Sequence, residues 1–267
     1  MVMQSITTRF SHELMTPFYE AIERYELIQE GDRIAVCVSG GKDSALLALL
    51  MKQYAERHSG VSVIFISMDP GYSRENRERL EKNCAELEIP VKIFDTDVLE
   101  QSQSQKEKSP CWVCARKRRG WLYKTAQEAG CNKIALGHNF DDVIETTLMG
   151  ILFGAQIQGM LPRVKSNHFE GMELIRPIYM VQERHIIKWA QYNGLEFLRC
   201  ACRFSDGESS SKRAYVKKLI ECLEKDEPKV KKNIFNSIHT ADCDTLVSYK
   251  VMGEKHSFLE RFRHNNT

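Results

Sequence analysis

Residues 39–44 combine glycines, hydroxyl side chains, a lysine and a carboxylate in the order Ser-Gly-Gly-Lys-Asp-Ser. Gly40 and Gly41 let the backbone turn sharply and approach a ligand closely, because no Cβ stands in the way. The backbone N–H groups of such a loop, at the start of a helix, converge on one point and bind anions. Lys42 adds a positive charge beside them, so this loop is expected to bind phosphate.

The loop differs from the Walker phosphate loop, which has four residues between its glycine and Gly-Lys, with Ser or Thr directly after the lysine. Here Asp43 follows Lys42. The string instead resembles the pyrophosphate loop of enzymes that split ATP into AMP and pyrophosphate. An ordinary strand-to-helix turn is the alternative, and the match of six residue types in this context argues against it. The residues expected at the phosphates are Ser39, Gly40, Gly41, Lys42, Asp43 and Ser44.

A second candidate site is the pair Cys111 and Cys114, which directly follows Pro110. Two thiolates three residues apart lie on one face of a helical turn and can hold one metal ion or two corners of a cluster. The cations at positions 116–119 favour the thiolate form. A redox dithiol and a chance pair in a cysteine-rich chain are the alternatives.

A metal centre on this pair needs further ligands, and Cys200 and Cys202 are the candidates. These two are poorly spaced to bind one ion together if the chain between them is extended. The remaining cysteines are expected to be small packing residues: Cys37, Cys84, Cys131, Cys222 and Cys243.

The third motif is Gly-His-Asn-Phe-Asp-Asp at residues 137–142. Gly137 is expected to end a strand, and Asp141 and Asp142 to begin a helix, where capping and the helix dipole also favour acidic residues. Beside bound ATP, however, a carboxylate can hold Mg²⁺ against the phosphates. His138 is either part of this site or a polar residue satisfied in the core.

The hydrophobic pattern predicts the scaffold that must position these motifs. Strands are expected over residues 34–38, 61–66, 91–94 and 133–136, the second of them ending near Met68. Helices are expected over 5–30, 74–87, 115–129, 141–153, 183–192 and 212–224, and another follows the phosphate loop, capped by Asp43 or Ser44. This alternation predicts an α/β fold, a parallel sheet with helices on both faces, with ligands bound beyond the carboxyl ends of the strands.

The 267 residues suffice for one large α/β domain with a small appendage. We expect a packing helix in residues 1–30, a catalytic domain in 31–200 and a basic helical extension in 201–267. Residues 101–108 are expected to be mobile and 154–171 to be loop-like. The charge run at 225–232 is expected to be a solvated face, and the net charge of +2 does not by itself indicate a nucleic-acid partner.

The sequence contains no apolar run of about 18 residues and no secretory signal at its start. We therefore expect a cytoplasmic protein without a membrane partner. In that compartment the nine cysteines are not expected to form a disulfide framework.

Taken in order, the motifs resemble the tRNA 2-thiocytidine synthetase family, a branch of the PP-loop tRNA thiolases. The resemblance runs from roughly residue 20 to 240. It rests on the phosphate loop, the cysteine pair followed by basic residues and Gly120, the motif at 137–142, Arg176-Pro177 and a late cysteine. It implies the adenine nucleotide alpha hydrolase-like fold. Residues 1–36 lack the cysteines of an N-terminal zinc finger, which favours the branch that modifies cytidine 32.

The resemblance also implies the reaction and its residues. ATP with Mg²⁺ would adenylate the C2 oxygen of a cytidine, and sulfur delivered through a 4Fe–4S cluster would replace it. The cluster ligands would be Cys111, Cys114 and Cys200, with Cys202 as a substitute, because this chain has Cys-Ala-Cys where the family typically has a second Cys-x-x-Cys. Lys42, Asp43 and Asp141 would join these cysteines in catalysis, and the nucleotide would also contact Met68, Gly137, His138 and Asp142.

The implied partners are tRNA and a sulfur donor, either sulfide or a cysteine desulfurase, and a homodimer is left open. The basic residues 116–119 would contact the RNA backbone or the ATP phosphates. Trp112 and Trp121 are candidates for stacking on a base, although core packing is favoured for each. Two other functions stay open: an adenylating enzyme that thiolates another nucleotide or a small acceptor, and a non-catalytic ATP-binding Fe–S redox protein.

Overall fold

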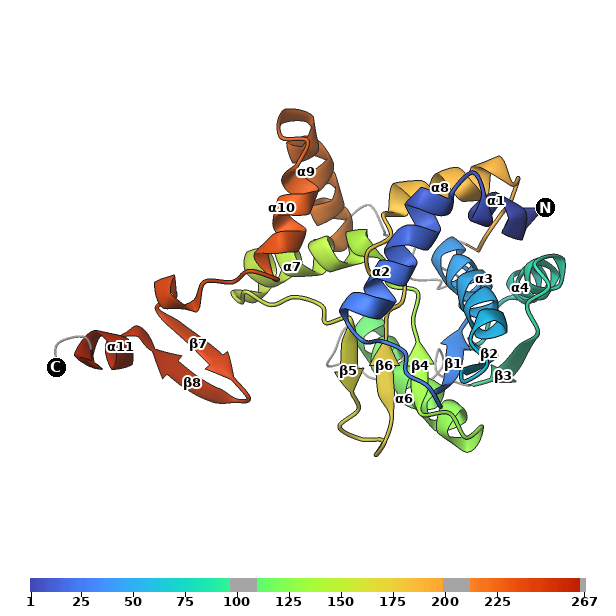
Figure 1. The fold of residues 1–267 in the computed structure, drawn as a ribbon, viewed down its shortest axis with the longest axis horizontal. Coiled ribbons are helices and arrows are strands. Elements are labelled where there is room, and N and C mark those ends of the chain that lie inside the picture. The colour runs from blue at the N-terminus through green and yellow to red at the C-terminus, as the bar shows by residue number, and fades with distance from the viewer. Residues whose placement is uncertain (97–109, 199–211, 265–267) are drawn as a thin grey trace.

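A six-stranded sheet forms the centre of the protein (Figure 1). The computed structural model of the chain describes residues 1–96, 110–198 and 212–264, with the backbone alone for residues 110–116 and 264. The strand order is β3-β2-β1-β4-β6-β5, and β5 alone among these six runs antiparallel to its neighbour. The strands are β1 (Arg33–Cys37), β2 (Ser62–Asp69), β3 (Val91–Asp95), β4 (Lys133–Ala135), β5 (Arg163–Lys165) and β6 (Glu173–Ile175).

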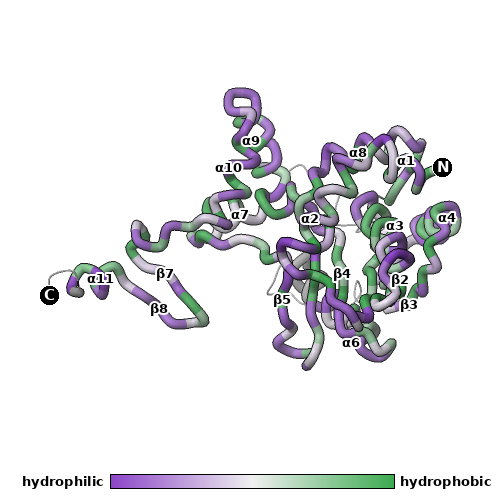
Figure 2. Tube along the Cα trace, viewed as in Figure 1, coloured by the Kyte–Doolittle hydropathy of each residue, from purple (hydrophilic) through white to green (hydrophobic). Residues whose placement is uncertain are grey.

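The two faces of the sheet bury separate hydrophobic clusters, as the alternation along β1 illustrates. Ile34 and Val36 pack into the larger cluster, whereas Ala35 and Cys37 pack into the smaller one on the opposite face. The larger cluster holds residues of α2 (Thr16–Arg24), α3 (Lys42–Arg57), α4 (Arg74–Glu86) and α8 (Glu183–Tyr192). The smaller one lies under α6 (Pro110–Glu128). Figure 2 shows apolar (green) stretches on strands of the sheet and also on helices such as α3. The expected parallel α/β fold is confirmed.

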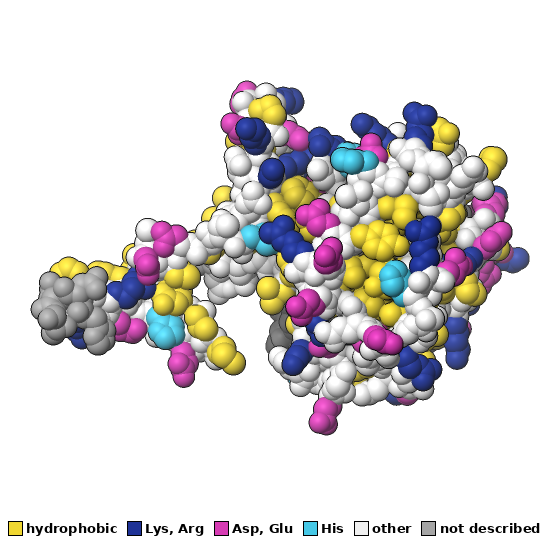
Figure 3. Space-filling model, in the orientation of Figure 1, with side chains coloured by type: hydrophobic (Ala, Val, Ile, Leu, Met, Phe, Trp, Pro, Cys, Tyr) yellow, Lys and Arg dark blue, Asp and Glu magenta, His cyan; other side chains and the backbone are white. Residues whose placement is uncertain are grey.

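The C-terminal part of the chain divides into a packed portion and an arm. Helices α9 (Lys212–Asp226) and α10 (Val230–Ser237) pack against α7 (Phe140–Gly154). Beyond them, η3 (Cys243–Thr245), β7 (Ser248–Val251), β8 (Glu254–Ser257) and α11 (Phe258–His264) form an arm joined to the body by a narrow neck (Figures 1 and 3). The sequence pattern did not predict this hairpin.

The helix expected over residues 5–30 is instead three shorter segments. These are α1 (Val2–Thr7), the π-helix η1 (Ser11–Met15) and α2, which ends at Arg24. Pro17, at the start of α2, has no N–H to donate to a preceding turn, and Glu26 has a positive φ of 49°, which a right-handed helix excludes. The single-helix prediction was therefore wrong, although these residues do pack against the core.

Two further boundaries differ from the sequence prediction. Residues 154–171 were expected to be loop-like, but the short edge strand β5 lies within them. A strand of three residues is too short to show a two-residue period. Helix α3 begins at Lys42 with Gly41 as its N-cap, so neither Asp43 nor Ser44 caps it, contrary to expectation. Residues 101–108 lie outside the described residues, and no helix among the described ones is long and apolar enough to cross a membrane.

Candidate functional site

The loop between β1 and α3 is closed by its own side chains. The Ser44 hydroxyl donates to the Gly41 carbonyl (2.9 Å) and accepts from the backbone N–H of Ser39 (3.0 Å). This bonding explains why Ser44 lies inside the helix and not at its cap. Gly40 has φ +83°, a conformation that strains any residue with a side chain, and a Cβ there would also displace the Leu198 side chain, 2.5 Å away.

The loop after β4 packs directly on the start of α3. A Cβ on Gly137 would lie 3.0 Å from the backbone nitrogen of Ser44. Because residue 137 is glycine, the two loops at the carboxyl ends of β1 and β4 can touch. The structure thus brings together two of the motifs that lie almost 100 residues apart in the sequence.

A cavity of about 320 Å³ opens where these loops meet. Met68 and Leu136 contribute apolar wall, and Arg118 and Arg119 of α6 contribute positive charge. Such a cavity suits a ligand that is flat and apolar at one end and anionic at the other. The described residues that line it are Cys37, Val38, Ser39, Asp43, Ser44, Met68, Arg118, Arg119, Leu122, Leu136, Gly137 and His138.

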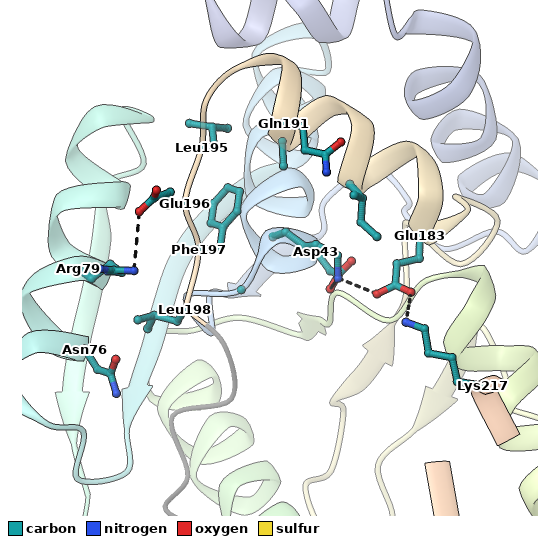
Figure 4. Close-up of a pocket in the computed structure, with 14 residues that line it drawn as sticks. Asp43, Asn76, Arg79, Glu183, Gln191, Leu195, Glu196, Phe197, Leu198 and Lys217 are labelled. Carbon is teal, nitrogen blue, oxygen red and sulfur yellow. Dashed lines mark hydrogen bonds and ion pairs between the residues drawn. The ribbon is translucent and has the colours of Figure 1, made fainter. Parts of the chain in front are cut away.

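A larger cleft of about 1020 Å³ adjoins the same loop (Figure 4). It lies between α4, α8 and the stretch from Leu195 to Leu198, and Asp43 lines both this cleft and the smaller cavity. The backbone N–H of Leu198 donates to the carbonyl of Gly40 (3.0 Å), which ties that stretch to the phosphate loop.

Lys42 is held by carboxylates. Its Nζ lies 2.8 Å from Oε1 of Glu183 and 3.1 Å from Oδ2 of Asp43, while Lys217 binds the other Glu183 oxygen at 2.6 Å. Figure 4 shows Glu183 between the loop and Lys217. Burial opposes the charge on Lys42, but the neighbouring carboxylates outweigh it and raise its pKa. Burial raises the pKa of Asp43 despite the adjacent lysine.

The two carboxylates at the start of α7 already have structural partners. Asp141 accepts from the backbone N–H of Glu183 (2.7 Å) and lies 3.4 Å from Lys231. Asp142 accepts from the N–H of Asn139, the N-cap, and pairs with Arg213 (3.0 Å). Within the described residues, no three His, Cys, Asp or Glu side chains are grouped so that they would hold a metal ion.

His138 has a defined hydrogen bond. Nε of Arg176 donates to its Nδ1 (3.2 Å), and because an arginine can only donate, the ring must carry its proton on Nε2. Burial, together with the charges of Arg176, Arg213 and Arg119, lowers the pKa of His138 to about 3. His138 is therefore a neutral N–H donor at the cavity and not a general base near pH 7.

Cys111 and Cys114 lie in the first turns of α6, whose later residues line the cavity. Cys200 and Cys202 lie outside the described residues. Cys37 lines the cavity, and burial raises its pKa to about 12, so it stays a thiol. Cys84 and Cys131 are buried as predicted, whereas Cys222 and Cys243 are exposed, because both lie on C-terminal elements outside the main core.

One other expectation was wrong, and another holds for most but not all of the residues concerned. Trp121 is 37% exposed on the outer side of α6, so it is not a core residue; the side chain of Trp112 lies outside the described part. The charge run at 225–232 is not wholly solvated. Its Lys231 has a side chain only 19% exposed, held between Asp141 and Glu224.

Sequence reasoning missed four charged residues at the site: Glu183, Arg213, Lys217 and Lys231. All but Glu183 come from α9 and α10, whose basic character was visible in the sequence. A lysine that faces water and one that faces a buried carboxylate have the same local pattern. Glu183, as the first residue of a helix, has an ordinary explanation in the helix dipole.

The chain is similar to known proteins over most of its length. The PP-loop domain family matches residues 7–220. The tRNA-cytidine(32) 2-sulfurtransferase of Citrifermentans bemidjiense is 36% identical over 224 residues, covering 82% of this chain and 86% of the relative. The protein of the same name from Coxiella burnetii is 33% identical over 246 residues, covering 91% and 95%.

Among solved structures, the chain resembles the U34-tRNA thiolase NcsA from Methanococcus maripaludis, determined with its 4Fe–4S cluster. The TM-score is 0.69 at 22% identity, and the match covers 90% of this chain and 82% of that one. At this identity the likeness shows a shared fold.

Proposed function

Since the chain belongs to the PP-loop family, and within it to the tRNA-cytidine(32) 2-sulfurtransferases, we propose that it is an ATP-dependent tRNA thiolase. In this proposal ATP adenylates the C2 oxygen of cytidine 32 and releases pyrophosphate. The oxygen, a poor leaving group by itself, can then depart as part of AMP. Sulfur then replaces that oxygen to give 2-thiocytidine, with pyrophosphate as the other product. The sulfur comes from sulfide or a cysteine desulfurase.

One observation carries the proposal: the helix that begins with the cysteine pair forms a wall of the cavity at the phosphate loop. Arg118, four residues after Cys114, lines that cavity together with Ser39 and Ser44. Four helical residues span about 6 Å. A sulfur centre at the start of α6 and a nucleotide on the loop would therefore be close neighbours.

The residues of the loop supply the electrostatics of the adenylation step. The N–H groups at the start of α3 bind the phosphates, and Lys42 leaves Glu183 to stabilise the charge that develops on them. Lys217 keeps Glu183 paired during this exchange. Mg²⁺ would arrive with ATP, held chiefly by phosphate oxygens and by Asp43, which lines both cavities. The neutral Nε2–H of His138 would donate to the nucleotide.

The cysteines fit an iron–sulfur cluster as donors, since thiolates are its usual ligands. We propose that Cys111, Cys114 and Cys200 hold it, with Cys202 as the substitute for Cys200. This described stretch of the chain ends two residues before Cys200 at Leu198, whose backbone N–H donates to the carbonyl of Gly40 on the phosphate loop (3.0 Å). When bound, the cluster would supply the centre that carries the sulfur to be transferred.

The test is mass spectrometry of tRNA nucleosides from cells that lack this protein, complemented with variants. The wild-type protein should restore 2-thiocytidine, and Cys111→Ala and Lys42→Ala should not. Purified without oxygen, Cys111→Ala should lose iron and sulfide but bind ATP, whereas Lys42→Ala should keep the brown cluster. Normal thiolation by Cys111→Ala would contradict the cluster assignment.

The alternatives give different results in the same assays. If the purified protein releases AMP and pyrophosphate but cells that lack it keep a normal level of 2-thiocytidine, the protein thiolates another acceptor. Tight ATP binding without release of AMP or pyrophosphate in the presence of any tRNA would indicate a binding protein. That result would overturn the proposed enzymatic activity.

A further inference from the structure

Helix α6 separates two cavities. Arg118, Arg119 and Leu122 line the nucleotide cavity described above. Other residues of the same helix face a second, shallower cavity of about 270 Å³ on its outer side. It is lined by Lys117, Gly120, Trp121, Lys124 and Phe169. One helix diameter, about 10 Å, lies between the two.

Gly120, which lines this cavity, meets no described side chain that would require glycine. It lies inside a helix of 19 residues, where glycine is less stable than alanine. Apart from its two chain neighbours and the backbone of its own helix, a Cβ at this position would meet no atom of the described residues within 4 Å. The helix therefore leaves bare backbone open where it lines this cavity, at a cost to its own stability.

The walls around this bare backbone are aromatic and positively charged. Trp121 is 37% exposed, and Nζ of Lys124 lies 5.3 Å from the centre of its ring. Phe169 is fixed from the other side by stacking on Tyr123. Lys124 also lies 3.9 Å from Glu128. Because both side chains are more than half exposed, this ion pair is weak and leaves the lysine able to bind a phosphate.

We propose that this outer cavity binds one unstacked nucleotide of the tRNA substrate, neighbouring the cytidine that enters the nucleotide cavity. The base would lie against Trp121 over the bare backbone at Gly120, and Lys124 would bind its phosphate. This inference rests on the proposed function. Single-stranded RNA loops are bound in this way, by aromatic rings for the bases and by cations for the backbone.

The decisive variant is Gly120→Ala, because its two effects have opposite signs. A methyl group over the bare backbone should weaken binding of an unmodified tRNA transcript about fivefold, while the added helix propensity raises the melting temperature by about 2 °C. A purely structural role for Gly120 would lower the melting temperature. Trp121→Ala should weaken tRNA binding about tenfold. Binding is measured by filter retention with the full chain.

Lys124→Ala has a matched control in Lys82→Ala. Lys82 is an exposed lysine on α4 that pairs with Glu86 four residues later, as Lys124 does with Glu128. Lys124→Ala should weaken tRNA binding several-fold, and Lys82→Ala should not. ATP affinity, measured by calorimetry, should be unchanged in all four variants, which distinguishes a tRNA nucleotide from ATP as the occupant.

If tRNA binds the wild-type protein and Gly120→Ala or Trp121→Ala leaves its affinity unchanged, the outer site is overturned while the proposed function stands. Equal losses in Lys82→Ala and Lys124→Ala would overturn it too, because they would indicate a general effect of charge. Failure of the wild-type protein to bind tRNA would overturn the proposed function along with the site.

Discussion

The Nζ atom of Lys42 lies 2.8 Å from Oε1 of Glu183, so a carboxylate at the start of α8 holds the lysine of the phosphate loop. The second oxygen of Glu183 is bound by Lys217 at 2.6 Å. Either lysine can therefore leave without stranding the half-buried carboxylate. The charge of Lys42 can therefore be removed by substitution without loss of the fold.

Replacing Lys42 by alanine should accordingly weaken ATP binding by at least about tenfold, because the phosphates lose their mobile cation. The melting temperature should change by no more than about 2 °C, since Glu183 keeps Lys217 as its partner. Calorimetry and thermal unfolding check the two expectations. Lys52→Ala, a change on the same helix away from the loop, serves as the control, and an unchanged ATP affinity in Lys42→Ala would exclude the lysine from the site.

The variant Glu183→Gln should have the opposite effect on nucleotide affinity. It keeps the shape of the side chain but removes the charge that competes with phosphate for Lys42 and Lys217. At fixed Mg²⁺, ATP binding should become a few-fold tighter, roughly 1 kcal/mol for a charged hydrogen bond released from competition. Weaker ATP binding would mean that Glu183 contributes directly to holding the nucleotide or its metal ion.

The lowered pKa of His138 predicts that the free energy of unfolding depends on pH. Its pKa is lowered to about 3 in the folded protein, while the unfolded chain takes up its proton near 6.5. Between these values the unfolded state binds more protons, so the stability contributed by His138 rises with pH up to about 6.5 and is level above it. Below pH 6.5 it should be lost at no more than about 1.4 kcal/mol per pH unit.

Urea unfolding at several pH values between 5 and 7.5 measures this slope in the wild-type protein and in His138→Asn. The variant should show a shallower loss toward acid. Arg176→Gln, which removes the donor to Nδ1, should also flatten the slope, because the ring can then take up a proton. Parallel profiles for all three proteins would show that His138 is not held neutral.

Lys133 stabilises the opposite end of the sheet. It is 2% exposed at the start of β4, and its Nζ binds Oδ2 of Asp32 (2.5 Å) and the carbonyl of Leu27 (3.0 Å). Lys133→Met should lower the free energy of unfolding by about 3–5 kcal/mol, because Asp32 is left as a buried charge without its cation. The double variant with Asp32→Asn should recover part of the loss.

Equilibrium unfolding in urea measures both variants. ATP affinity of the folded Lys133→Met protein should equal that of the wild type, since the phosphate loop lies at the other ends of the strands. A loss smaller than about 1 kcal/mol would mean that water enters to solvate Asp32 once the lysine is absent.

The sequence alone determined the strands and helices around the phosphate loop and the chemistry of that loop. Helix α8 has the predicted bounds, and β1 and its glycine loop lie where the pattern placed them, because hydrophobic period and glycine position act over a few residues. An anion site of backbone N–H groups at a helix start is likewise local. The family resemblance rested on these short motifs.

Only the tertiary structure decided which charges meet. Glu183 reaches Lys42 from α8, Lys217 reaches Glu183 from α9, and Arg176 fixes the tautomer of His138 from the end of β6. None of these pairs has a signal in sequence spacing, because each joins elements that come together through packing of the whole chain. A basic helix looks the same in the sequence whether its lysines face water or a buried carboxylate, and packing alone tells the two apart.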